Sequence, residues 1–519
     1  MRRVGKAELD FSAVADHPLG ANDVSGTHAW RLMKGSVQEW PLAPDGGLKR
    51  ECLSFSQVIA QSVASIAPVA TPTLIIPLVF ANGQNGTWLA YLLASIAVLL
   101  VTYHVNQFAR RGASSGALYT FVGKGLGPTW GVIAGWSLVL AYVFTGSACL
   151  AGAANYSVRL AHLFSVQFDF AMTLVSMLAV TGMSWWLAYH DIRLSTRAML
   201  LLEFTSVALM LVLAASFFLK TGRFVDHAQL SLAGLNAKGI RLALVLAMFS
   251  FVGFESATAL GHEAKEPLKS IPRSMLVSVP AAGAFFVFMS YVMVMAFRGQ
   301  ATALDKSDAP LTFIANATGM AAFGVAIAAG VVMSQIAGSL ACINAAARVV
   351  YSMSRHGFLD ASTASTHKTN ATPHVAVTIS SVLVAAVPIF LFLRHVALLD
   401  IFGYLGTLAT FGFLFAYILI VLAAPIFLRQ RGELKAAPVI LSIAALALLA
   451  FPLVASFDPT DTPPNNYLPY IFIALLMLGV ARFAYLRVTR PEILHEMEED
   501  LGLTRFGRPS AGDSTRRSH

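Results

Sequence analysis

The sequence predicts an all-α, polytopic membrane protein, and two features of its composition support this. Its 519 residues are 56% hydrophobic and only 12% charged, whereas soluble globular proteins carry roughly 25% charged residues. Apolar blocks recur from Leu53 to Tyr485 without the polar linkers that separate soluble domains. We therefore expect one transmembrane domain over 53–488, preceded by a polar segment over 1–52 and followed by a polar tail over 489–519.

Each helix that crosses a bilayer needs about 20 apolar residues, because the hydrocarbon core is about 30 Å thick. Segments of this kind occur often enough to predict twelve transmembrane helices. They cover residues 55–80, 88–108, 129–155, 170–189, 196–219, 240–261, 276–297, 321–350, 375–393, 398–425, 437–456 and 468–486.

Basic residues in the loops predict the orientation, since Lys and Arg concentrate on the cytoplasmic side. The loops after the even-numbered helices hold Arg110, Arg111, Lys124, Arg193, Arg197, Lys265, Lys269, Arg273, Arg355, Lys368, Arg429, Arg431 and Lys435. The opposite loops are poorer, and 81–87 and 458–467 contain no basic residue. Both termini are thus expected in the cytoplasm and the chain in the cell membrane. Because the basic residues are scattered, the net charge of +9 does not predict a nucleic-acid partner.

Two of the predicted spans contain helix-breaking residues. The first carries Pro68 and Pro72 near its middle, and each proline removes a backbone donor. Backbone groups freed at that depth must face protein or a water-lined cavity, where they can bind a polar solute. The sixth span carries Gly253 and Glu255 in an apolar run. One such kink is usually structural, but helices one and six correspond if ten helices form two inverted five-helix repeats, in which paired breaks build the substrate site.

Several stretches around these spans resemble the amino acid–polyamine–organocation (APC) transporter superfamily, of the amino acid permease type. They are Phe251–Ser256, Glu263–Pro267, Ile271–Arg273, Ser115–Trp136 and Asn344–Gly357. The resemblance extends over about 53–430. It implies a LeuT-type core of two inverted five-helix repeats with helices one and six interrupted, two extra helices, and transport by alternating access.

The resemblance also implies that the backbone of helix one binds a substrate carboxylate and that helix six receives the amino group and side chain. It places Phe249 at an outer gate. The implied substrate-binding residues are Ala67, Pro68, Val69, Ala70, Thr71, Phe249, Phe251, Val252 and Gly253. The first break lacks the glycines usual in the family, so polyamines, other small organocations and organic acids stay open beside an amino acid.

Two acidic residues in the spans are candidates for coupling transport to protons. A charged side chain at mid-membrane costs about 2.5–3.5 kcal/mol on insertion scales, so retaining Glu255 suggests a role. The alternative is a structural hydrogen bond to a neighbouring helix. Glu203 in the fifth span is the second candidate, with a salt bridge to Arg197 or contact with the interface as its alternative.

Other functional classes fit the sequence less well. A channel would show repeated pore loops or rings of like charge. An ATP-driven pump would carry a Walker A motif, which is absent. A membrane-embedded enzyme would need a nucleophile–base pair or a metal-ligand cluster within the spans, and the sequence contains no HExxH or CxxC motif. We therefore predict a secondary active transporter that moves an amino acid by symport or exchange. It is expected to lie in a lipid bilayer, to couple to protons, and to need no cofactor or metal, while its oligomeric state stays open.

Overall fold

The computed structural model describes most of the chain. Described are Leu48 and residues 50–190, 192–307, 309–457 and 463–490. They all belong to one of the two units into which the chain divides, Trp40–His519. Most of the predicted N-terminal segment and nearly all of the predicted tail, 1–47, 49 and 491–519, lie outside the described residues.

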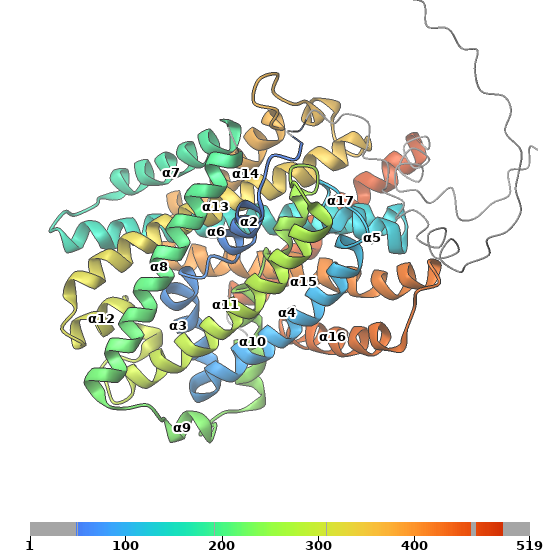
Figure 1. The fold of residues 1–519 in the computed structure, drawn as a ribbon. Coiled ribbons are helices and arrows are strands. Elements are labelled where there is room, and N and C mark those ends of the chain that lie inside the picture. Colours follow the sequence, from blue (N-terminus) through green and yellow to red (C-terminus); the bar gives the residue numbers. More distant parts are fainter. Residues whose placement is uncertain (1–47, 49, 191, 308, 458–462, 491–519) are drawn as a thin grey trace, which may run out of the picture. The chain divides into compact units, whose positions relative to one another are not determined.

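The described elements are all helical (Figure 1). The longer helices are α2 (Phe55–Ile66), α4 (Thr87–Ala109), α6 (Pro128–Leu163), α7 (Phe170–His190), α8 (Ile192–Thr221), α10 (Ala237–Phe249), α11 (Pro267–Phe297), α13 (Ala321–Arg355), α14 (His374–Leu393), α15 (Leu398–Gln430), α16 (Ala436–Ala455) and α17 (Leu468–Thr489). Shorter helices are α3 (Ile76–Gly83), α5 (Leu118–Leu126), α9 (His227–Leu230) and α12 (Pro310–Ala317). The short elements η1 (Thr71–Ile75), η2 (Gln84–Gly86), η3 (Phe254–Leu260), η4 (Leu304–Lys306), η5 (Ala361–Ala364) and η6 (Asn465–Tyr467) connect them.

Within the described residues, 11 helical stretches are long and apolar enough to cross a membrane. The first, Phe55–Ala109, has 55 residues and contains α2, α3 and α4. At about 1.5 Å per residue, this number of helical residues would extend roughly 80 Å if continuous, more than twice the thickness of a hydrocarbon core. The predicted class of an all-α, multi-pass membrane protein is confirmed at this level.

Some helices continue past the predicted spans. The third span was expected to end at residue 155, but α6 continues to Leu163. The side chain of Arg159 lies over the Tyr156 ring at 5.7 Å, so the basic residue packs along the helix instead of ending it. The apolar residues therefore predict only the part of the helix that can span the membrane, and the helix itself continues beyond that part.

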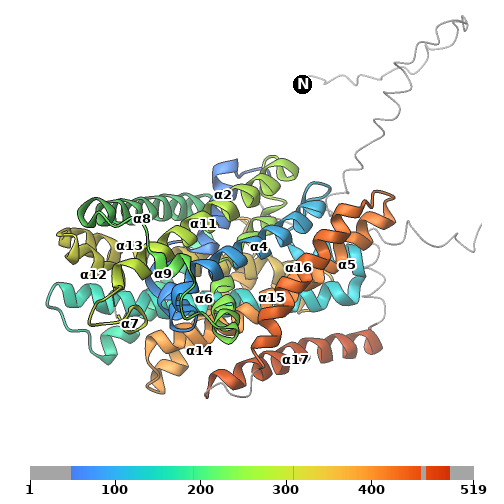
Figure 2. The same ribbon diagram turned by 90° about the horizontal axis from the view of Figure 1, so that it is seen from below.

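α6 is the central helix of the described fold and packs most extensively against α13 and α15. Small residues bring these helices close together. A Cβ atom at Gly338 would lie 3.0 Å from Cys149 Sγ, and one at Gly412 would lie 2.8 Å from Ala141 Cβ. In both views α12 lies toward the left of the packed helices and α5 toward the right (Figures 1 and 2).

The first helical stretch is interrupted after Ile66. Ala67 has a left-handed conformation with φ 47°, which a residue with a side chain rarely adopts. The proline at 68 disfavours a helical conformation at the residue before it, so the helix ends there. The chain resumes as η1, a wide π-helical turn that accommodates Pro72 with its missing N–H, and continues into α3.

The second interruption follows α10. Gly253 has φ 85°, a conformation that glycine adopts at little cost, and the chain then continues as the tighter 3-10 helix η3. Two segments almost two hundred residues apart thus break within apolar sequence.

Candidate functional site

The two interruptions are in direct contact. A Cβ atom at Gly253 would lie 2.8 Å from Ser65 Cβ, the last polar side chain before the first break. The hydroxyls of Ser65 and Ser256 are 2.8 Å apart. Ser62 Oγ donates to the carbonyl of Phe254 at 2.7 Å. All these residues are buried, so the two breaks form one internal site joined by serine hydroxyls.

The residues of the first break are also buried. The structure buries all five of them: Ala67, Pro68, Val69, Ala70 and Thr71. The Ala70 N–H donates to the Ala67 carbonyl at 2.9 Å, which closes a short turn between α2 and η1. The predicted residues of helix one therefore form a compact turn inside the protein.

Glu203 of α8 lies against this turn and is 1% exposed. Ser334 of α13 donates to its Oε1 at 2.5 Å, and the backbone N–H of Val69 faces the same carboxyl. Its Oε2 has no hydrogen-bond partner among the described residues. The alternative prediction of an ion pair with Arg197 concerns a side chain outside the described ones.

Glu255 lies on the other side of the second break and is fully buried. Tyr142 of α6 donates to its Oε1 at 2.7 Å, and Tyr417 of α15 donates to its Oε2 at 2.6 Å. Both carboxyl oxygens are thus occupied by neutral donors. Neither tyrosine was predicted as a partner of Glu255, although a tyrosine hydroxyl in an apolar span needs a partner and so signals a polar neighbour.

The predicted aromatic residues point to different neighbours. Phe249 packs against Phe402 of α15, with ring centres 5.8 Å apart, and against Gly406. Phe251 packs edge-to-face on Phe286 of α11 at 5.1 Å. Phe249 therefore lies between the end of α10 and α15, whereas Phe251 packs among helices behind the second break. Val252, in the same turn, is 4% exposed.

A buried ion pair lies beside the starts and ends of the broken helices. Arg348 of α13 donates to both carboxyl oxygens of Glu263, at 2.7 and 2.8 Å, and both side chains are 2% exposed. The N–H groups of Cys52 and Leu53 donate to the Glu263 carbonyl at 2.7 and 2.8 Å. Leu53 also pairs with Ala264 in a parallel bridge. We call Cys52, Leu53, Glu263, Ala264 and Arg348 the buried latch.

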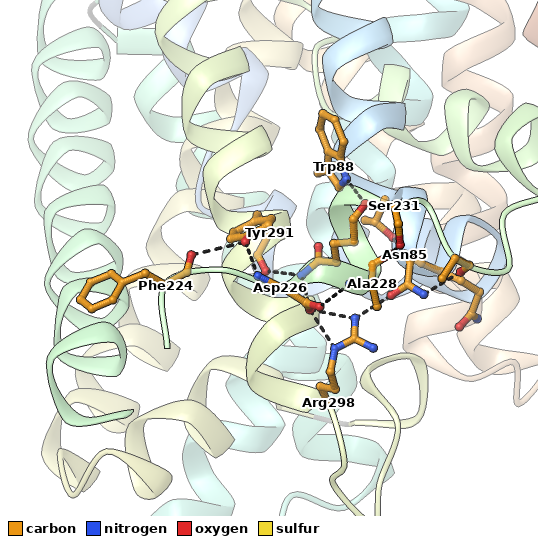
Figure 3. A network of polar contacts seen from close by, with 12 residues as sticks. Asn85, Trp88, Phe224, Asp226, Ala228, Ser231, Tyr291 and Arg298 are labelled. Carbon is orange, nitrogen blue, oxygen red and sulfur yellow. Dashed lines mark hydrogen bonds and ion pairs between the residues drawn. The ribbon is translucent and has the colours of Figure 1, made fainter. Parts of the chain in front are cut away.

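A second polar network joins the loops near α9 (Figure 3). Arg298, after α11, donates to Asp226 at 2.8 Å and to Asn85 Oδ1 at 2.6 Å. Gln229 Nε2 also donates to Asp226 at 2.9 Å. The Asp226 N–H donates to the Tyr291 hydroxyl at 2.7 Å. We call these five residues the loop clasp.

Asp226 lies outside the membrane-spanning segments, in the loop between α8 and α10. Burial acts to raise its pKa, but hydrogen bonds from Gln229 and Arg298, and the positive charge of Arg298, outweigh this effect. They hold the pKa of Asp226 below its ordinary value. The carboxylate is therefore stabilised in its charged form.

The sequence is similar to proteins of one family. The amino acid permease family profile matches residues 57–492. The branched-chain amino acid permease BcaP of Bacillus subtilis is 25% identical over 450 residues, which cover 80% of this chain and 90% of that protein. The methylthioribose transporter of Bacillus subtilis is 23% identical, covering 67% and 75%. The low-affinity putrescine importer PlaP of Escherichia coli is 24% identical, covering 59% and 68%.

Proposed function

The chain belongs to the amino acid permease family, and from this membership we propose that it is a secondary active transporter that carries an amino acid across the cell membrane by alternating access. Its proposed topology has twelve transmembrane helices and both termini in the cytoplasm. Ten helices would form two inverted five-helix repeats, with two extra helices. The 55-residue first stretch supports this count, because it is long enough for two crossings.

The contact between the two interruptions is the observation that carries the proposal. α2 and α10 both end at this site, so their carboxyl ends bring partial negative charge to it. The η1–α3 segment begins there, and its first N–H groups bring partial positive charge. A zwitterionic amino acid matches both: its ammonium group fits the helix ends and its carboxylate the helix start. A polyamine has only ammonium groups, so it would bind the helix ends and leave the helix start without a carboxylate.

We propose protons as the coupling ion, with Glu203 and Glu255 as candidate carriers. Glu203 touches the first break through the Val69 N–H and has one oxygen without a partner. A change in its charge would therefore act directly on the proposed substrate site. Glu255 has both oxygens occupied by tyrosine hydroxyls. Its proton exchange would require a movement of α6 or α15 that releases one hydroxyl.

The function is tested with the purified full chain in proteoliposomes. Uptake of a panel of labelled amino acids and putrescine is measured with and without an imposed pH gradient. We expect at least one amino acid to accumulate when the outside is acidic, with no sodium requirement. Uptake of putrescine alone would overturn the amino acid proposal, and accumulation that follows sodium instead of pH would overturn proton coupling.

The coupling residue is tested by Glu203→Gln and Glu255→Gln in parallel. Glutamine keeps the shape of glutamate but cannot titrate. The variant at the proton carrier should lose accumulation driven by the pH gradient and keep exchange of internal for external amino acid. If both variants accumulate substrate with the pH dependence of the parent protein, neither carboxyl carries the proton.

A further inference from the structure

Among the described residues, several buried polar atoms without hydrogen-bond partners lie on η1 and on the helices next to the first break. Thr71 and Gln335 are each 0% exposed. Thr71 Oγ1, both amide atoms of Gln335 and Asn155 Nδ2 have no hydrogen-bond partner in the described part of the chain. Leaving a buried polar atom unpaired costs about 1–3 kcal/mol, so native proteins retain few of them. Unpaired atoms close to one another can be satisfied by a polar group that binds between them.

The three residues belong to α6, α13 and η1, and contacts at Gly152 and Tyr156 of α6 bring these elements together. A Cβ atom at Gly152 would lie 3.0 Å from Gln335 Cδ and closer still to Nε2, so a side chain here would displace the Gln335 amide. The same position lies 3.2 Å from Leu74 of η1, three residues after Thr71. Asn155 is one turn further along α6 from Gly152. The next residue, Tyr156, donates to the Thr73 carbonyl at 3.3 Å and so holds α6 against η1.

We propose that this junction of Thr71, Asn155 and Gln335 binds the side chain of the transported amino acid and selects a neutral hydroxyl or carboxamide. The inference rests on the proposed function, since Thr71 belongs to the turn assigned to the substrate. Gln335 offers a donor and an acceptor, Thr71 a hydroxyl, and Asn155 a donor. A hydrocarbon side chain would leave these atoms unpaired.

The three side chains are uncharged, so the junction provides no counter-ion for a charged substrate side chain. The carboxyl of Glu203 on α8, which contacts α13 through Ser334, is not one of these three groups and is a proposed proton carrier. Burying a charge without a partner costs more than burying a neutral hydrogen-bonding group. The junction therefore favours neutral polar side chains over both apolar and charged ones.

Threonine and valine provide the sharpest test, because they have nearly the same shape and differ by a hydroxyl. Asparagine and leucine form a second pair. The concentrations of each that halve uptake of a labelled substrate are measured in proteoliposomes. We expect the full chain to prefer threonine over valine, and asparagine over leucine, by about tenfold or more, since 1.4 kcal/mol corresponds to tenfold.

Gln335→Met removes both amide atoms at similar volume and should bring each ratio to within about threefold. Gln61→Met is the matched control, because Gln61 is also buried but donates from Nε2 to the Ala341 carbonyl at 2.9 Å, away from the junction. Its ratios should equal those of the parent protein. If Gln335→Met does not fold, Thr71→Val gives the same comparison with a smaller change.

The inference is overturned if the parent protein transports valine as well as threonine, or if Gln335→Met and Thr71→Val keep the parent ratios. In the second case a buried water or the helix contact alone explains the unpaired atoms. Failure to transport any amino acid would instead contradict the proposed function. The two failures are therefore distinguishable.

Discussion

The buried latch and the loop clasp both contain an arginine–carboxylate pair, but their surroundings differ. In the buried latch, Arg348 and Glu263 are 2% exposed. In the loop clasp, the Arg298 side chain is 40% exposed and that of Asp226 only 5%. Removing one partner of a buried pair lowers the free energy of unfolding strongly, because the other charge is left buried alone. An exposed pair contributes little to that free energy. The same pair of functional groups thus has a different energetic role in each region.

The two networks also connect different parts of the fold. The buried latch joins the residues before α2 and after η3 to α13. The first of these segments leads into one interrupted helix, and the second leads out of the other. The loop clasp joins the turn before α4 to the α9 loop and the end of α11 (Figure 3). The latch therefore holds the broken helices against α13. Because the proposed alternating access moves these helices relative to their neighbours, we expect the latch to open during transport. The clasp joins only the ends of other helices, so we expect it to stay closed.

The largest effect is expected from Arg348→Met. It leaves the Glu263 carboxylate buried without its cation, which should lower the free energy of unfolding by about 3–5 kcal/mol. Thermal or denaturant unfolding of the purified protein measures this loss. The control is the double variant Glu263→Gln/Arg348→Met, which removes both charges and should recover most of the stability. Equal stability of Arg348→Met and the parent would show that the pair is not buried as a charged pair.

Gly253→Ala should have the next largest effect. Residue 253 has a left-handed conformation, and the added Cβ atom would lie 2.8 Å from Ser65 Cβ. We expect a loss of about 2–3 kcal/mol in the free energy of unfolding. Gly432→Ala is the matched control, since Gly432 also has a positive φ, 70°, but nothing lies within 4 Å of its Cβ position. It should lose roughly 1 kcal/mol. Similar losses in the two variants would argue against a tight contact between the breaks.

These contacts also show what the sequence could and could not predict. The prolines at 68 and 72 and Gly253 predicted both breaks, because the backbone restriction is local to each residue. The partners of Glu255 were not predictable, since Tyr142 and Tyr417 are 275 positions apart and meet only through packing of α6 and α15. The same holds for Gln335, whose position depends on a glycine in another helix.

Arg298→Met should have a smaller effect than either change above. The pair with Asp226 is partly exposed, so its loss should cost about 1 kcal/mol or less. Added salt should weaken the clasp in the parent protein and leave the latch almost unchanged, because screening acts mainly on exposed charges. The measurement is unfolding of the parent and Arg298→Met at low and high salt. A salt-independent difference between them would contradict an exposed clasp.

The smallest effect concerns acidic pH. Because the folded protein holds the pKa of Asp226 below its ordinary value of 3.8, the carboxylate contributes stability above about pH 4. This contribution is lost as the pH falls through the lowered pKa. Arg298→Met should shift that pKa upward and lose the contribution at higher pH. Unfolding profiles of the two proteins between about pH 5 and 3 test this, and coincident profiles would contradict it.

Labelling of Cys52 tests most directly whether the latch opens during transport. Cys52 lies in the latch and is 5% exposed. In a background with Cys149→Ser and Cys342→Ser, its reaction with a membrane-impermeant maleimide reports the exposure of this region. We predict faster labelling in Glu263→Gln/Arg348→Met and when a transported amino acid is added to the parent, and unchanged labelling in Arg298→Met. Equal labelling in the latch variant and the parent, or faster labelling in Arg298→Met, would contradict it.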